Sequence, residues 1–374
     1  MNGTLKHSAI KRKLLLSLML SLILMTTMFL FACTPQGTRP VENRTVFDTN
    51  PTDTTPPIVA VDPPIVEEPD PVQCALISFA GDCLFGNSAS FDALYVKEGP
   101  EYFFSGVAEV FANDDLTVVN LEIPLTTATE RFYKGSPTDK DGNPYTYYWY
   151  KAPPQYVDIL TKGSIEVVSL ANNHTFDYVM EGYLETQQVL EDAGVEFFTR
   201  ETPFIRDVNG IKVGILGFSF DLYTITGIKT AIERAFSDGA EVIITYFHEG
   251  IEYAYYPSEL QRAAAYTAIE CGAAAVIMSH PHVIQGLEEY QGAFIAWSLG
   301  NFCFSPFLYP ADRDSMIVQL ELVRTEEGIT CTPNIIPCYY SSTSGPNDFK
   351  PVVLHGDEAQ RLLDRIAGLS KKDS

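Results

Sequence analysis

Short apolar runs, rich in β-branched and aromatic residues, recur between residues 74 and 301, and several end in polar residues. The runs are CALISFAGD, LTVVNLE, IEVVSLANN, IKVGILGF, EVIITYFHE, AAAVIMSH and AFIAWSLGN. Helix-like stretches lie between or after them, at Pro153–Lys162, Gly182–Ala193, Ile228–Ser237, Ser258–Cys271 and Gly356–Leu369. This alternation predicts an α/β (α+β) fold, in which helices cover buried sheets.

The first 33 residues resemble an export signal. Four basic residues precede an uncharged apolar run from Leu14 to Ala32, as in secretory signals. The run ends in LFAC, which resembles the lipobox of bacterial lipoproteins and predicts a lipid on Cys33. An uncleaved anchor is the alternative, because the run is long enough to span a bilayer. Either way, we expect a protein tethered to the bacterial cell membrane at its extracellular face.

Composition divides the rest of the chain. Residues 33–72 are crowded with Pro, Thr and Asp and predict a stiff stalk. We expect a signal peptide at 1–32, a folded domain at 73–345, and a C-terminal helix and tail at 346–374. Within the domain, residues 126–151 contain DGNPYTYYWYK and break the alternation. This segment is either a lid or wall of a site, or a hairpin that packs its aromatic rings on the domain.

The chain is strongly acidic, with a net charge of −23, and loss of the first 32 residues leaves 21 basic residues against 48 acidic ones. Such a surface repels nucleic acid and anionic membranes, so an anionic substrate would need local capture, for example by bound cations. An exported chain permits disulfides, and Cys331 and Cys338 are close enough in sequence for a bridge across a hairpin. Spacing alone leaves that bridge open.

Polar residues gather where the predicted strands end. Because the carboxyl ends of parallel strands meet at one edge of a sheet, these residues are expected to converge. They are Asp82; Asn120 and Glu122; Asn172, Asn173, His174 and Asp177; His248, Glu249 and Glu252; and His280 and His282. A turn at Asp82 and asparagine caps after the third strand are the structural alternatives.

Four of the six histidines lie at these strand ends, beside carboxylates and amides. On an extended backbone, His280 and His282 would point to the same side and reach one point. A lone histidine is more often a core group, but this concentration indicates a metal centre. The donors suit Mn, Zn, Fe or Co, and are too many for one tetrahedral ion. We therefore expect two divalent transition metal ions that share a carboxylate.

The order of GDCLFG, NLEIPLT, SLANNHTFDY, HEGIEY, SHPHV and SLGNF resembles the CapA family of poly-γ-glutamate capsule biosynthesis, over about residues 75–304. Its domain looks like the calcineurin-type metallophosphoesterases. The resemblance implies a four-layer α-β-β-α sandwich. It also implies an anionic or cell-wall polymer such as poly-γ-glutamate as partner, together with membrane proteins of capsule synthesis.

The resemblance further implies a role for each motif residue. Asp82 and His282 would hold one metal, Asn173, His248 and His280 the other, with Glu122 between them and His174 as general acid. The residues expected to support these ligands or contact substrate are Asn120, Asn172, Asp177, Glu249, Glu252 and Asn301.

Two positions depart from the family pattern. Asn87 stands where members commonly have Arg, which removes a fixed cationic donor for an anionic substrate. Glu249 stands where members commonly have Trp, and either makes the pocket more acidic or orients His248. Two functions follow. One is a metal-dependent hydrolase of an amide or phosphoester bond in a polymer, and the other is a non-catalytic component that binds polymer during capsule assembly or export. A purely structural metal site is disfavoured, because such sites are usually closed and thiolate-rich.

Overall fold

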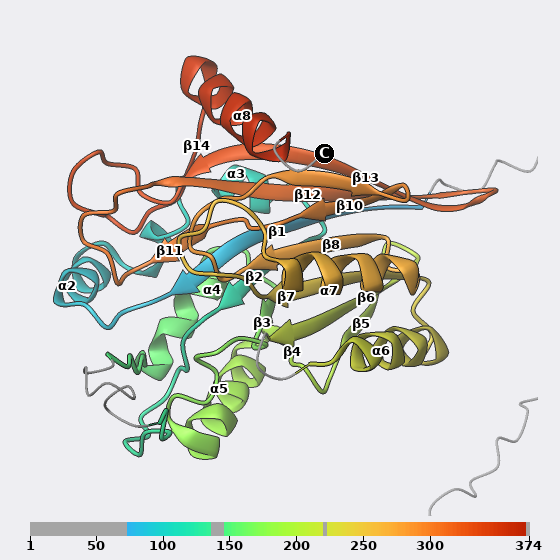
Figure 1. Ribbon diagram of the computed structural model, residues 1–374. Helices are drawn as coiled ribbons and strands as arrows, with labels where there is room; N and C mark the ends of the chain where they lie inside the picture. The colour runs from blue at the N-terminus through green and yellow to red at the C-terminus, as the bar shows by residue number, and fades with distance from the viewer. Residues whose placement is uncertain (1–72, 136–145, 220–222, 372–374) are drawn as a thin grey trace, which may run out of the picture. The chain divides into compact units, whose positions relative to one another are not determined.

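The computed structural model describes residues 73–135, 146–219 and 223–371. The predicted signal peptide, the lipidation site Cys33 and the predicted stalk lie outside these residues. Across the described part of the chain, no helix combines the length and apolar character needed to cross a membrane. The described residues form two mixed sheets with helices on their outer faces (Figure 1).

The first sheet has eight strands, in the order β14-β13-β12-β1-β2-β3-β4, with β11 paired beside β1. β1 to β4 run parallel, whereas β12, β13 and β14 are each antiparallel to their neighbours. The strands are β1 (Cys74–Leu84), β2 (Leu116–Leu121), β3 (Val167–Ser169), β4 (Glu196–Phe198), β11 (Asn301–Phe304), β12 (Asp314–Thr325), β13 (Gly328–Tyr339) and β14 (Val352–Val353).

The second sheet has six strands, in the order β5-β6-β7-β8-β10-β9. The four inner strands are parallel and the two edge strands antiparallel to their neighbours. The strands are β5 (Phe204–Val208), β6 (Ile211–Ser219), β7 (Val242–His248), β8 (Ala275–Ser279), β9 (Leu287–Tyr290) and β10 (Ala293–Ala296).

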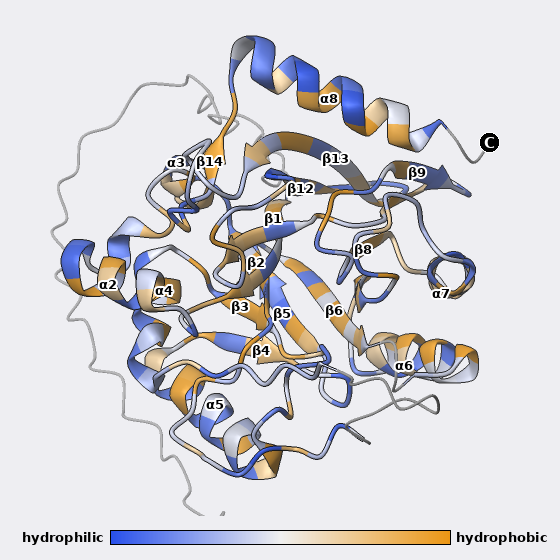
Figure 2. Ribbon diagram, turned by 60° about the vertical axis from the view of Figure 1, so that its left-hand side comes forward, coloured by the Kyte–Doolittle hydropathy of each residue, from blue (hydrophilic) through white to orange (hydrophobic). Residues whose placement is uncertain are grey.

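Three hydrophobic clusters hold these layers together. The cluster between the sheets joins side chains such as Phe79 and Val118 of the first sheet to Ile215, Tyr246 and Ile277 of the second. A second cluster joins the first sheet to α2 (Ala89–Glu98), α3 (Ala108–Phe111), α4 (Val157–Lys162) and α5 (Val179–Ala193). A third joins the second sheet to α6 (Ile225–Ser237) and α7 (Glu259–Glu270). The predicted α-β-β-α sandwich is therefore confirmed, and Figure 2 shows the mainly hydrophobic strands between the helices.

The predicted helices form, with small shifts at their ends. A capping box between Ser258 and Gln261 starts α7, and Gly194, at φ +73°, ends α5. Pro154–Tyr156 is a 3-10 turn that leads into α4. The final helix, α8 (Gly356–Ser370), buries Leu362 and Ile366 in the cluster between the sheets. The sequence analysis missed α2 and α3.

Two expectations need correction. The run AFIAWSLGN is not one strand, because β10 pairs in the second sheet and β11 pairs with β1 in the first. The disulfide between Cys331 and Cys338, which their spacing left open, does not form, because both residues lie on β13 and both thiols are free. Seven residues apart on one extended strand, their side chains point to opposite faces.

Candidate metal centre

The predicted donors meet near the carboxyl ends of β1, β2, β3, β7 and β8. Asp82 does not end β1, which runs on to Leu84, but lies where the pairing of β1 with β11 shifts register. Its backbone N–H donates to the carbonyl of Gly300 at 3.0 Å. Gly81 makes this approach possible, since a Cβ there would lie 1.9 Å from the same carbonyl oxygen. The glycine thus brings β1 close enough to place Asp82 in the site.

The carboxylate of Asp82 is fully buried and well partnered. Its Oδ1 accepts from the Asn120 amide at 2.8 Å, and its Oδ2 accepts from the His280 backbone N–H at 3.2 Å. The Nδ1 of His282 lies 3.3 Å from Oδ2. Burial by itself raises the pKa of Asp82, but His282 and the nearby His248 outweigh it and hold that pKa below its usual range. Asp82 is therefore a negatively charged carboxylate at neutral pH, the form in which it can bind a metal ion.

Glu122, by contrast, has two buried carboxylate oxygens with no hydrogen-bond partner in the described part of the chain. Its backbone N–H donates to Cys83 at 2.8 Å and fixes the residue just beyond β2. The Oε1 atom lies 3.4 Å from Nε2 of His248 and 3.9 Å from Nε2 of His282. A carboxylate without hydrogen bonds in such a place is unfavourable, and a bound cation would satisfy it.

Three atoms that could each bind a metal ion surround Nε2 of His248. It lies 2.9 Å from Oδ1 of Asn173, 3.1 Å from Nδ1 of His280 and 3.4 Å from Oε1 of Glu122. One ring nitrogen carries at most one proton and cannot satisfy three such partners. Two ligands bound to one ion at about 2.1 Å lie about 3.0–3.4 Å apart, which matches this spacing. The residues therefore fit a metal ion.

The other ring nitrogens are used to orient the histidines. Nδ1 of His248 lies 3.1 Å from Oγ of Ser279 and 3.2 Å from the Asn120 amide, and Nδ1 of His282 lies 3.0 Å from Oδ1 of Asn301. Contacts of this kind fix the ring of a metal-binding histidine and leave the remaining nitrogen for the ion. The sequence analysis named Asn120 and Asn301 but missed Ser279, which ends β8.

His280 and His282 both reach the site, although not by the expected route. β8 ends at Ser279, and the two histidines follow at φ +103° and +58°, so the backbone between them is not extended. Such angles cost on the order of 1–3 kcal/mol for residues other than glycine and cluster at functional sites. Burial, with His248 and His282 nearby, lowers the pKa of His280 to about 2. The imidazole of His280 is thus neutral, the form that binds metal.

Around this centre the asparagine motif plays two parts. Asn173 faces His248, whereas Asn172 donates to Oδ1 of Asn120 at 3.0 Å and to the Leu121 carbonyl at 2.9 Å. Oδ1 of Asn172 accepts from the His174 backbone N–H at 3.1 Å. Asn172 therefore links the ends of β2 and β3 through these hydrogen bonds.

His174 stands apart from the donors and forms a pair with Asp177. Its Nδ1 lies 2.7 Å from Oδ2 of Asp177, which also accepts from the Tyr150 backbone N–H at 2.7 Å. Nζ of Lys134 lies 2.5 Å from the other carboxylate oxygen. The rings of Tyr150 and His174 lie 4.6 Å apart. Asp177 thereby fixes the ring of His174, whose side chain lines the pocket described next.

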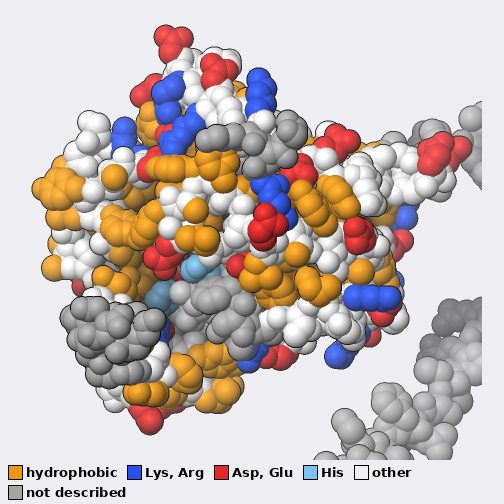
Figure 3. Space-filling model, viewed as in Figure 1, with side chains coloured by type: hydrophobic (Ala, Val, Ile, Leu, Met, Phe, Trp, Pro, Cys, Tyr) orange, Lys and Arg blue, Asp and Glu red, His pale blue; other side chains and the backbone are white. Residues whose placement is uncertain are grey.

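A pocket of about 460 Å³ opens onto these residues, and Glu122, His174 and His282 are part of its lining. Figure 3 shows histidine side chains reaching the surface among hydrophobic ones. Glu252 and Asn87 also line it, and both are exposed.

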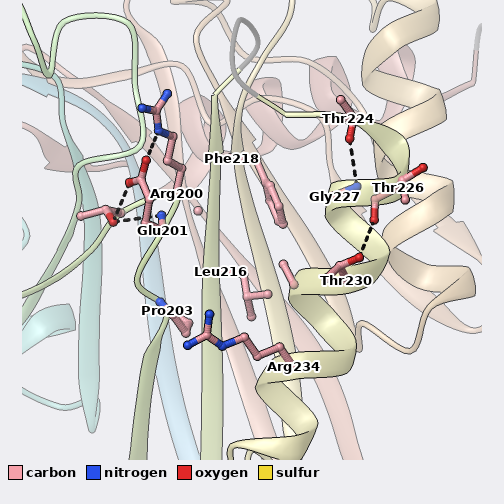
Figure 4. A pocket seen from close by; sticks show the side chains of 13 residues that line it. Arg200, Glu201, Pro203, Leu216, Phe218, Thr224, Thr226, Gly227, Thr230 and Arg234 are labelled. Atoms are coloured by element: carbon pink, nitrogen blue, oxygen red, sulfur yellow. Dashed lines mark hydrogen bonds and ion pairs between the residues drawn. The ribbon is translucent and has the colours of Figure 1, made fainter. Parts of the chain in front are cut away.

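The carboxylate of Glu249 is buried and accepts from the hydroxyl of Tyr223 at 3.0 Å and from the N–H of Gly250 at 2.9 Å. It is not among the side chains that line this pocket. A second pocket of the same volume lies between β6 and α6 and is lined by Arg200, Glu201 and Arg234 (Figure 4). Its lining includes none of the predicted donors, which lie at or beside the first pocket.

Among the residues that the structure describes, two groups of side chains could hold an ion. The first is Asp82, Glu122 and His248, and the second is Glu122, His280 and His282; within each group the ligand atoms lie within 4.8 Å of one another. Glu122 belongs to both. The geometry therefore supports a metal site centred on Glu122.

Comparison with known proteins agrees with the order of the motifs. Residues 76–306 match the family of the bacterial capsule synthesis protein PGA_cap. The chain belongs to this family. It is 26% identical over 272 residues to the capsule biosynthesis protein CapA of Bacillus anthracis, covering 66% of this chain and 63% of that protein. It is 28% identical over 273 residues to the PGA biosynthesis protein CapA of Bacillus subtilis, covering 67% and 68% respectively.

Among solved structures, the chain is similar to the calcineurin-like phosphoesterase YfkN of Bacillus subtilis, with a TM-score of 0.43 and 16% identity. The likeness covers 80% of this chain and 98% of that one. The match of residues 76–306 to the family model confirms the predicted family.

Proposed function

We propose that this member of the capsule synthesis family is a metal-dependent hydrolase that acts on an anionic or cell-wall polymer. The observation that carries the proposal is Glu122, whose two buried oxygens lack hydrogen bonds while Nε2 of His248 and of His282 face it. Asp82 and His282 would hold one divalent ion, and Asn173, His248 and His280 a second, with Glu122 shared. Such ions supply Lewis-acid stabilisation of developing negative charge and activate water.

The chain's own residues would perform the proton transfer. Asp177 holds Nδ1 of His174, so Nε2 is the atom that can donate a proton to a leaving group in the pocket. Asn120, Ser279 and Asn301 would keep the imidazoles in place through their contacts with Nδ1 of His248 and of His282. Closed thiolate sites are typical of structural metals, whereas this site opens into a pocket. These features favour catalysis over a structural ion.

The first test is elemental analysis of the full chain purified without chelator, combined with turnover assays on a generic phosphodiester and on poly-γ-glutamate. We expect two equivalents of transition metal, with cleavage of one substrate identifying the bond. Absence of bound metal would overturn the proposal.

The role of His174 is tested separately. His174→Ala should keep the metal content and lose turnover, because the ring bonds Asp177 rather than the donor cluster. His355→Ala is the matched control, since His355 is exposed and makes no side-chain cap for α8. Full turnover in His174→Ala would contradict its role as acid.

We also propose that the protein is anchored at the extracellular face of the bacterial membrane through a lipid on Cys33 and works beside capsule synthesis membrane proteins. The LFAC motif supports this. Cys33→Ser should move the protein out of the membrane fraction on fractionation of producing cells. A variant that stays in the membrane fraction would indicate an uncleaved anchor instead.

A non-catalytic role in capsule assembly is the second candidate. The described residues that line the pocket include no Lys or Arg, and Asn87 provides no charge where members commonly have Arg. Catalysis on a highly charged polymer would therefore depend on the ions alone. Bound metal without turnover on any polymer would favour this second role.

A further inference from the structure

Two walls of aromatic rings flank the candidate metal centre. On one side, Tyr150 lies 4.6 Å from the ring of His174 and stacks on Tyr148 at 6.0 Å with an interplanar angle of 9°. On the other side, Phe304 lies 4.8 Å from His282 and 5.6 Å from Phe307. All of these side chains line the same pocket. Aromatic rings are therefore a large part of the lining beside the centre.

The aromatic lining extends beyond this pocket. A neighbouring pocket of about 400 Å³ shares Tyr253, His282 and Phe307 with it and adds Tyr255 and Tyr309. Tyr148, Tyr253 and Tyr309 are 58%, 52% and 73% exposed, so their rings are available to a ligand. The two pockets therefore adjoin at these shared residues. We call the two together the aromatic groove and define it by the lining residues of both pockets.

Tyr253 is held in an unusual conformation at the junction of the two pockets. Its φ is +63°, a region that bulky residues rarely adopt, and its N–H donates to the Pro281 carbonyl at 2.8 Å. The ring lies 6.2 Å from His282 and 6.2 Å from Phe307. Retention of such a conformation indicates that the position of this ring matters.

The charges of the aromatic groove do not suit a polyanion. No Lys or Arg occurs among its described lining residues, while Glu252 and Asp312 do. Lys134 supports one wall, but its ammonium contacts Asp177 and the Tyr148 carbonyl. Away from the metal centre, a chain of carboxylates would find no cation along the groove and would face a protein of net charge −23.

We propose that the aromatic groove binds an uncharged glycan strand of the substrate polymer, with sugar rings stacked on the exposed tyrosines beside the metal centre. The C–H face of a pyranose ring is apolar and weakly positive, and complements the negative face of an aromatic ring. Ser88, Asn87 and Glu252 offer hydrogen bonds to hydroxyls. This inference rests on the proposed function, because it names the substrate class of the same site.

The test is calorimetric titration of the full chain, in a detergent without a sugar headgroup, with three probes. The probes are tetramers of β-1,4-linked N-acetylglucosamine, of β-1,4-linked glucose and of γ-linked glutamate. At least one sugar tetramer should bind, and its affinity should hold between about 0.01 M and about 0.1 M salt, a range in which the Debye length falls from about 30 Å to about 10 Å. Binding of the glutamate tetramer alone, or of no tetramer, would overturn the proposal.

Variants locate the binding. Tyr253→Ala and Tyr309→Ala should each weaken sugar binding roughly two- to tenfold. Tyr133→Ala is the matched control, since Tyr133 is 76% exposed and does not line the groove. If all three variants weaken sugar binding to the same extent, the assignment of the binding site to this groove is overturned. If the protein purified without chelator holds no metal but binds sugar, the proposed hydrolase is refuted and the groove is supported. If the protein holds metal and turns over substrate but binds no sugar, the groove is refuted and the hydrolase is supported.

Discussion

Glu122→Gln is the substitution that most directly tests the metal centre. It keeps the size of the side chain and removes a charge whose oxygens make no hydrogen bonds in the described part of the protein. A metal present at about 1,000 times its dissociation constant stabilises the folded state by about 4 kcal/mol. The folded unit spans roughly 300 residues, for which the entropy of unfolding is about 0.6 kcal/mol/K. Metal should therefore raise the Tm of the wild-type protein by about 6–7 °C.

The variant should lose most of that gain. If loss of the Glu122 charge weakens metal binding about 100-fold, the stabilisation falls to about 1.4 kcal/mol and the shift in Tm to about 2 °C. Calorimetric scans with excess Mn²⁺ and with chelator measure both values. Glu252→Gln is the matched control, because it removes the same charge from the exposed mouth of the same pocket, and its metal-dependent shift should equal that of the wild type.

The scans in chelator provide a second check. Without metal, Glu122→Gln should be nearly as stable as the wild type or more stable, because the carboxylate has no hydrogen bonds to lose. A loss of more than about 2 kcal/mol in chelator would mean that His248 and His282 already compensate the charge. In that case the buried carboxylate would no longer be evidence for a cation, and the reasoning would be refuted.

Three further outcomes follow from the same contacts. His282→Ala should lower the metal content found by elemental analysis, and full retention would mean that His282 is not a ligand. Gly81→Ala should lower the urea midpoint by the equivalent of about 3 kcal/mol, since its Cβ would meet the Gly300 carbonyl at 1.9 Å; an unchanged midpoint would contradict the required approach. Burial by itself raises the pKa of Asp312, but the hydrogen bond from Arg365 outweighs it and holds that pKa below its usual range. The pairing of Asp312 with Arg365 therefore stabilises the folded state above about pH 4, and this contribution is lost as pH falls. Wild-type urea midpoints should therefore drop more between pH 7 and pH 3 than those of Arg365→Leu, and equal drops would argue against the pair.

Local patterns were enough to predict most of the helices in the described residues, but only about half of the strands. The capping box of Ser258 with Gln261 and the left-handed glycine Gly194 are local signals of this kind, which start α7 and end α5. The division of AFIAWSLGN between two sheets was not predictable in this way. Its cause is non-local, because β11 is drawn to β1 where Gly81 allows the backbone at Gly300 to come close.

The sequence argument for the histidine pair expected both side chains in one place, which the structure shows, but it assumed the wrong backbone conformation. An extended backbone was expected to bring His280 and His282 to one side, but both have positive φ beyond the end of β8. Sequence spacing constrains where side chains can go only when the backbone conformation is known. Left-handed residues at a functional turn are the case in which the period of a strand no longer applies.

Reactive groups and binding walls differ in how visible they are in a sequence. Asp82, Glu122 and the histidines are recognisable because polar groups are costly to bury, so their presence after apolar strands requires an explanation. Tyr148 and Phe304 cannot be recognised in this way, because aromatic rings occur in any core. These two line the same pocket although they lie far apart in the chain. The sequence can therefore indicate the chemistry of the centre while leaving the substrate open. The ring-lined approach to that centre, whose described lining residues include Glu252 and Asp312 but no Lys or Arg, is the evidence that bears on substrate, and it supports the proposed glycan over a polyanion.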